Sequence, residues 1–187
     1  MPRVLIPLAN GCEELEAVTI IDLLRRAEIE VITAGLESGA APVPITASRG
    51  VVLVPDCALD SVLNDDFDMI VLPGGLPGAD YLAADARITA LLQRQAAAGR
   101  YCAAICAAPK VLAGAGVLAG KQATFYPGAV DQSQYPAFQA LDAPVVVDGA
   151  VITSRGPGTA LDFALQLIET LVGTERRQAV EQALVRP

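Results

Sequence analysis

Hydrophobic and polar positions follow two alternating patterns along the chain. Short apolar runs recur, and 68–72 (DMIVL) is almost continuously apolar, as expected of a strand covered on both faces. The segments between such runs repeat their apolar residues every three or four positions, which is the spacing of one buried helix face. In segment 13–27 the residues that keep this spacing are Ala17, Ile20, Ile21, Leu24 and Ala27.

These patterns predict strands that alternate with helices. The expected strands are Arg3–Ala9, Glu30–Gly35, Asp68–Leu72, Tyr101–Ile105, Val145–Val147 and Val151–Ser154. The expected helices are Glu13–Ala27, Ala86–Ala98, Ala107–Ala113, Pro157–Val172 and Thr174–Leu184, with a hairpin over Pro44–Asp56. Alternation of this kind predicts one α/β domain over residues 1–187, a flavodoxin-like, doubly wound and mostly parallel sheet with helices on both faces.

Composition and charge narrow the class of protein further. Apolar residues make up 53% and charged residues 18% of the 187 positions, which favours a packed domain over disorder. A net charge of −8 without basic clusters argues against a nucleic-acid-binding surface. No window approaches the roughly 20 apolar residues of a membrane span, and the short apolar run at the N-terminus is read as a strand and not a signal peptide. We therefore expect a cytoplasmic protein whose four cysteines are reduced thiols.

The absence of histidine from the chain restricts its chemistry. It excludes a Ser-His-Asp triad, a Cys-His dyad and a His-ligated zinc site from this chain alone. A nucleophile here has to be activated without imidazole.

Three loops at predicted strand ends carry unusual chemistry, and in a doubly wound fold such loops meet at one edge of the sheet. Cys106 lies at a strand-to-helix junction among alanines, the small neighbours that a sharp nucleophile elbow needs. There we expect free N–H groups and a helix N-terminus to lower the thiol pKa. A buried core cysteine without chemistry is the alternative. Cys102 is read as core, because its spacing from Cys106 is not that of a C-x-x-C redox pair.

The other two loops supply a carboxyl group and a pair of glycines. Glu16 lies one turn before Ile20, near the buried stripe of its helix, where it is either a first-turn acid or a protonated partner of the thiol. Gly74 and Gly75 follow the buried strand, where they form either a simple turn or an oxyanion hole built from backbone N–H groups.

Four ordered motifs make the sequence similar to one family over nearly its whole length, the ThiJ/PfpI superfamily in its DJ-one/YajL branch. The motifs are GCEELEAV at 11–18, VLPGG at 71–75, AAICAAP at 103–109 and TSRGPGT at 153–159. The resemblance implies a flavodoxin-like homodimer. It casts Cys106 as the oxidation-sensitive nucleophile, Glu16 as its protonated partner, and the N–H groups of Gly75 and Ala107 as local donors.

The resemblance also implies roles around this centre. Arg49 and Arg155 match arginines of the dimer interface and of an anion-binding region near the cysteine, although structural salt bridges are the simpler explanation of both. Arg26 matches as well, as an i, i+4 partner of Asp22. Tyr126 stands where human-type members carry a histidine, which puts any imidazole-dependent mechanism in doubt.

Two functions follow from the resemblance. The first is a deglycase or glyoxalase that acts on methylglyoxal or glyoxal adducts of protein and nucleotide amines and protects against oxidative and carbonyl stress. The second is a redox-sensing chaperone, a holdase, in which Cys106 is oxidised without turnover. No cofactor or metal is expected, because the sequence lacks G-x-G-x-x-G after its first strand and has no Walker motif.

Overall fold

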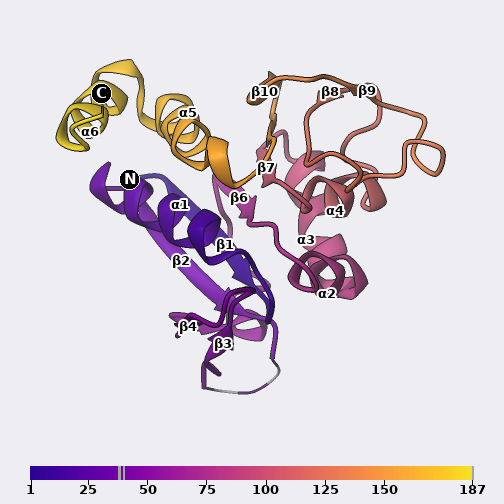
Figure 1. The fold of residues 1–187 in the computed structure, drawn as a ribbon. Helices are drawn as coiled ribbons and strands as arrows, with labels where there is room; N and C mark the ends of the chain where they lie inside the picture. Colours follow the sequence, from indigo (N-terminus) through magenta and orange to yellow (C-terminus); the bar gives the residue numbers. More distant parts are fainter. Residues whose placement is uncertain (38, 40, 187) are drawn as a thin grey trace.

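The computed structural model describes residues 1–37, 39 and 41–186. Its core is a seven-stranded sheet in the order β10-β11-β7-β6-β1-β2-β5 (Figure 1). The strands are β1 (Arg3–Leu8), β2 (Glu30–Gly35), β5 (Cys57–Ala58), β6 (Met69–Leu72), β7 (Tyr101–Ile105), β10 (Val145–Asp148) and β11 (Val151–Ser154). All neighbours pair in parallel except β10, which is antiparallel to β11. This confirms the predicted flavodoxin-like, mostly parallel fold.

Helices cover both faces of this sheet. The α-helices are α1 (Glu14–Arg26), α2 (Gly78–Ala84), α3 (Ala86–Ala97), α4 (Pro109–Gly114), α5 (Ala160–Val172) and α6 (Thr174–Ala183), and short 3₁₀ turns lie at Leu59–Val62 and Pro157–Thr159. Two small ribbons lie outside the main sheet, the hairpin β3 (Ile45–Thr46) with β4 (Val52–Leu53) and the pair β8 (Gln122–Ala123) with β9 (Gln139–Ala140). In the described part of the chain, no helix is long and apolar enough to cross a membrane.

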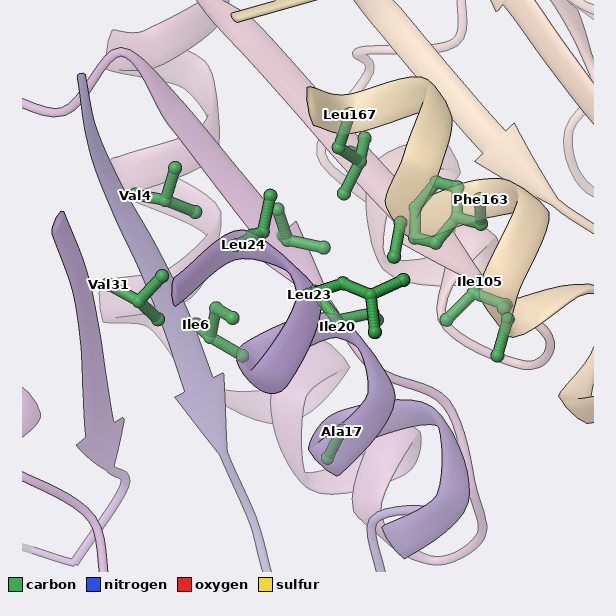
Figure 2. Close-up of a cluster of buried hydrophobic side chains, with 14 of the residues drawn as sticks. Val4, Ile6, Ala17, Ile20, Leu23, Leu24, Val31, Ile105, Phe163 and Leu167 are labelled. Carbon is green, nitrogen blue, oxygen red and sulfur yellow. The ribbon is translucent and has the colours of Figure 1, made fainter. Parts of the chain in front are cut away.

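Alternation along the buried strands produces two cores. In β1, Val4 and Ile6 belong to the core under α1 and α5, whereas Leu5 belongs to the core under α3 and α4. Figure 2 shows the first core, in which α1 directs Ile20 and Leu24 toward β1 and toward α5. This packing fixes the rotation of α1 about its axis, and so it fixes which carboxylates of its first turn are buried.

The structure differs from the sequence-based prediction at several boundaries. The helix expected from Ala107 begins at Pro109, and the helix expected from Pro157 begins at Ala160 after a 3₁₀ turn. Helix α2 and the β8–β9 ribbon were not predicted, because they are short and lie in Gly- and Pro-containing segments with little periodicity. The hairpin is present, but each of its strands is two residues long.

The strand order reverses its direction of growth between β1 and β6. The chain proceeds from β1 to β2 on one side, then crosses to β6 and β7 on the other. In open α/β sheets, ligands bind beyond the carboxyl ends of the strands at such a switch point. The three loops singled out from the sequence leave β1, β6 and β7, and therefore lie at this position.

Candidate active site

Cys106 occupies a strained turn between β7 and α4. Its φ of 63° is a left-handed conformation that non-glycine residues rarely adopt. The backbone holds the turn on both sides, since Cys106 N donates to Ser154 O at 3.0 Å and Cys106 O accepts from Tyr126 N at 2.9 Å. Its flanking alanines are buried, which permits the close backbone packing expected of an elbow. Cys106 itself is 9% exposed and lines the adjoining pocket.

The glycine loop after β6 packs against this elbow at backbone distance. A Cβ placed on Gly74 would lie 2.7 Å from Cys106 Cβ and 2.8 Å from Glu16 Oε2. A Cβ on Gly75 would lie 2.6 Å from the Cys12 carbonyl carbon, and Gly75 has a φ of +89°. Any larger residue would separate the loops, so both glycines are required by space, and Gly75 by conformation as well.

Glu16 reaches the elbow from α1 and is fully buried. Its Oε2 accepts a hydrogen bond of 2.8 Å from Gly74 N. Its Oε1 is buried with no hydrogen-bond partner among the described residues. An ionised carboxylate with one unpartnered oxygen is costly in such a place, whereas a proton on the carboxyl group would remove that cost and make it a hydrogen-bond donor.

The pKa values of the two groups respond to the same surroundings. Burial raises the pKa of Glu16 to about 7, against the lowering effect of hydrogen bonds from Gly74 N and from the Cys106 thiol. Burial and the charge of an ionised Glu16 raise the pKa of Cys106 to about 12, although the N–H groups of Gly75 and Ala107 lower it. The elbow therefore does not by itself depress the thiol pKa, and that expectation was wrong. The raised pKa of Glu16 agrees with the prediction.

Together these values mean that the two groups do not both ionise near neutral pH. The pair carries one negative charge above about pH 7 and shares one proton. A thiolate forms readily only while Glu16 holds that proton.

A pocket of about 430 Å³ opens over Cys106. Of the residues predicted for the site, Gly75, Ala107, Arg49 and Tyr126 line it together with Cys106. Tyr126 is half exposed, and its ring packs close to Gly156, where an added Cβ would lie 3.2 Å from Cδ2. The lining is completed by Glu13, Ser48, Leu76, Pro127, Gly128, Ala129 and Pro157.

Four predicted residues do not line this pocket: Glu16 and Gly74, which are buried next to Cys106, and Arg155 and Arg26. Arg155 forms an ion pair of 2.6 Å with Asp142, and Arg26 forms one of 2.9 Å with Asp22 on the surface of α1. The simple salt-bridge interpretation of Arg155 therefore describes its contact in this structure. Sequence reasoning missed Glu13 and Ser48 as pocket residues. The only available signal was their position in a loop and a turn already expected near the strand ends.

The remaining cysteines are set apart from Cys106 by their surroundings. Cys12 and Cys102 are buried, which raises the pKa of Cys12 to about 11 and that of Cys102 to about 12. Cys57 is partly exposed beside Thr33. All four thiols are free, as expected. Across residues 1–37, 39 and 41–186, no cluster of three or more His, Cys, Asp or Glu side chains is arranged to hold a metal ion.

Fold and site together define a flavodoxin-like α/β protein with a cysteine at a strand-to-helix elbow beside a buried glutamate. The chain belongs to the DJ-1/PfpI family, whose sequence profile matches residues 2–170. It is 45% identical to Protein dj-1beta of Drosophila melanogaster, with 97% of this chain and 95% of that protein aligned. The crystal structure of Drosophila melanogaster DJ-1beta superposes with a TM-score of 0.92 at 43% identity, covering 100% of this chain and 98% of that one.

Two further relatives show how the family varies in length and in name. Protein DJ-1 homolog B of Arabidopsis thaliana is 42% identical over 97% of this chain, but this chain covers only 41% of that longer protein. The Glutathione-independent glyoxalase DJR-1.2 of Caenorhabditis elegans is 38% identical, with 97% of this chain and 94% of that protein covered. An enzymatic role is therefore plausible within this family.

Proposed function

We propose that the protein is a Cys106-dependent enzyme that converts methylglyoxal and glyoxal, free or as adducts of protein and nucleotide amines, to 2-hydroxy acids. A relative that is named a glutathione-independent glyoxalase supports the substrate class. The pocket over Cys106 supports the reaction, because Cys106, Gly75 and Ala107 line it, and the buried carboxyl group of Glu16 lies next to the thiol.

The observation that carries the proposal is the buried carboxyl group of Glu16 next to the Cys106 thiol, with Oε1 unpartnered among the described residues. In the reactive form that we propose, the proton lies on Glu16 and the charge on sulfur, which has the N–H groups of Gly75 and Ala107 beside it. In this arrangement the nucleophile is formed without imidazole. Glu16 then serves as the proton carrier of the reaction.

In the first step, the Cys106 thiolate attacks the aldehyde-derived carbon. With free methylglyoxal a C–S bond forms, the C=O π-bond breaks, and the new alkoxide takes the proton from Glu16 to give a hemithioacetal. With an amine adduct, the same attack displaces the amine, which leaves with a proton. The N–H groups of Gly75 and Ala107 are placed to stabilise negative charge that develops at the elbow.

In the second step, the hemithioacetal rearranges within the pocket. Glu16, now ionised, removes the proton from the sulfur-bearing carbon and returns a proton to the neighbouring carbon, while the hydroxyl proton of the hemithioacetal passes to the neighbouring carbonyl oxygen. The aldehyde carbon is thereby oxidised to a thioester and the neighbouring carbonyl carbon reduced to an alcohol. Water hydrolyses the resulting thioester, which releases lactate from methylglyoxal or glycolate from glyoxal and restores the thiol. The sequence of steps needs no external oxidant or reductant.

Steady-state release of lactate tests this proposal. Wild-type protein should release many equivalents of lactate per thiol from methylglyoxal without added glutathione, and Cys106→Ala should release none above the uncatalysed rate. Cys102→Ala is the matched control, since that thiol is buried on β7, the strand that leads to the elbow, and it should retain activity. Equal activity of Cys106→Ala and wild type would contradict the proposal.

A redox-sensing chaperone that uses the same thiol is the second candidate. The specific observation in its favour is that Cys106 opens to a pocket beside backbone donors, which suit the oxygens of a sulfinate as well as an oxyanion. Turnover separates the two functions, because a sensor has no need to release product more than once per thiol.

We also propose that the protein works as a homodimer. The outer faces of α1 and the β3–β4 hairpin together expose large apolar side chains, each between 46% and 67% exposed. These are Leu15, Val18, Val51, Val52 and Val54. A second copy of the chain would remove this surface from water.

A further inference from the structure

Glu14 binds the turn of the β3–β4 hairpin to the first turn of α1. Its carboxylate accepts hydrogen bonds from Arg49 N at 2.8 and 3.1 Å and from Ser48 Oγ at 2.9 Å, and it lies 3.5 Å from Val51 N. Although the side chain is only 9% exposed and burial raises its pKa, these hydrogen bonds outweigh burial and lower the pKa of Glu14. The hydrogen bonds from the turn thus stabilise the ionised carboxylate of Glu14.

The hairpin turn is itself part of the Cys106 pocket, through Ser48 and Arg49. Its backbone also docks on the loop after β1, where Ser48 N donates to Cys12 O at 2.8 Å. The Ser48 hydroxyl lies 2.8 Å from Glu13 Oε2, so Ser48 is held by hydrogen bonds of its backbone and of its side chain. The Arg49 backbone N–H is the part of the turn that Glu14 holds directly.

The Arg49 side chain has little else to hold it. Among the described residues its guanidinium forms no ion pair, and its one hydrogen bond is a long one of 3.5 Å to Ser48 O. A guanidinium without a carboxylate partner at a pocket wall is suited to bind a carboxylate of a ligand. Its position depends on where the turn backbone places it.

We propose that Glu14 is a positioning residue: by fixing the backbone of the hairpin turn, it holds Arg49, for which the family resemblance implies an anion-binding role, at the wall of the Cys106 pocket. For the hydroxy-acid products this inference rests on the proposed function. The placement of Arg49 itself does not depend on turnover, and so it is tested without it.

The test compares two alkylating reagents of nearly the same size. Iodoacetate is anionic and iodoacetamide is neutral, and both react with the Cys106 thiolate by displacing iodide. The ratio of their rates at Cys106, measured by mass spectrometry of the peptide, reports the charge that the pocket presents and cancels differences in thiolate content. Arg49→Ala should lower this ratio by about threefold, as expected for the loss of one nearby positive charge in a solvated site.

Glu14→Gln gives opposite results for the two possible roles of Glu14. If the residue merely contributes negative charge, its removal should raise the iodoacetate ratio. The proposal expects the ratio to fall, by up to the same threefold as in Arg49→Ala, because Arg49 is no longer held at the pocket. In the Arg49→Ala background, Glu14→Gln should cause no further fall, since both changes act through one guanidinium.

The matched control is Asp60→Asn, which removes one negative charge from an exposed ion pair with Arg87 far from this loop and should leave the ratio unchanged. A rise or no change in Glu14→Gln, or an equal fall in the Arg49→Ala background, would overturn the proposal. If Glu14→Gln does not fold, Ser48→Ala removes one of the donors to Glu14 and should lower the ratio less. Failure of the enzymatic proposal would leave these rates interpretable, because they require only the thiol.

Discussion

Two glutamates of the same helix, two residues apart, have pKa values that their surroundings shift in opposite directions. Glu14 faces the hairpin and receives several hydrogen bonds, which lower its pKa. Glu16 faces the elbow, where burial outweighs the hydrogen bonds from Gly74 N and the Cys106 thiol and raises its pKa to about 7. When the surroundings shift the pKa values of two like groups in opposite directions, the two groups commonly have different roles, one structural and one catalytic. Position on the helix, and not residue type, thus assigns the proton carrier.

The four thiols should differ in reactivity for the same reason. After mild peroxide treatment, we expect sulfinic acid first on Cys106, although Cys57 is more exposed, because only Cys106 has a carboxyl proton and the N–H groups of Gly75 and Ala107 beside its sulfur. Peptide mass spectrometry over a time course measures this directly. Faster modification of Cys57 would show that exposure, and not the elbow, governs oxidation.

At the scale of elements, the site depends on the close approach of the β6 loop to the β7 elbow. Gly74→Ala should destabilise the fold by about 1–3 kcal/mol, because the new methyl group would overlap Cys106 Cβ and Glu16 Oε2. It should also lower turnover in the fraction that folds. Gly114→Ala in α4 is the control, since its methyl group would meet only Tyr135 Oη at 3.7 Å, and its stability should change by about 1 kcal/mol or less, upward. Denaturant unfolding compares the two, and equal stabilities would contradict the packing argument.

The main elements and their order were predictable, because buried strands and amphipathic helices leave strong periodic patterns. β2, β7 and β11 have the predicted bounds, and α1 differs by one residue at each end. What could not be predicted has a physical cause. The start of α4 at Pro109 depends on the left-handed turn at Cys106, which tertiary packing enforces, and α2 is too short for its periodicity to be seen.

At the same scale, the residues of the candidate site are of two kinds. Some can be identified from the local sequence, and others reach the pocket only through contacts between distant parts of the chain. Cys106, Gly75 and Ala107 follow from strand ends, so their meeting is a consequence of sheet topology. Ser48 reaches the pocket through a hairpin some 35 residues away from Glu13, a contact that no local pattern encodes. Arg155 shows the converse, since a matching motif did not place its side chain at the pocket.

For the whole molecule, the proposed homodimer makes a prediction about size. Light scattering at micromolar concentration should give twice the chain mass of 19.3 kDa. Val52→Asp, which adds a charge to the exposed apolar face of the hairpin, should shift the protein toward the monomer, whereas Val147→Asp on β10, about equally exposed but away from this face, should not. A wild-type mass of one chain would refute the dimer.

Because the hairpin of that face also carries Ser48 and Arg49, dimerisation and the Cys106 pocket share an element. Loss of the dimer in Val52→Asp should therefore be accompanied by a fall in lactate release per thiol. Steady-state assays on the separated monomer measure this, and a fully active monomer would show that the pocket is complete within one chain.

The central claim is that Glu16 holds the proton that would otherwise reside on Cys106, and it is tested most directly by alkylation of Cys106 as a function of pH. In wild type, the iodoacetamide rate should rise through the first ionisation of the pair, near or below pH 7. Glu16→Gln removes the mobile proton and keeps the shape, so the rise should move to higher pH, toward the value that burial imposes on the thiol. Turnover should fall by at least about 100-fold. A shift to lower pH would show that Glu16 is ionised and suppresses the thiolate, and superimposable profiles would show that the two groups do not interact; either result contradicts the mechanism.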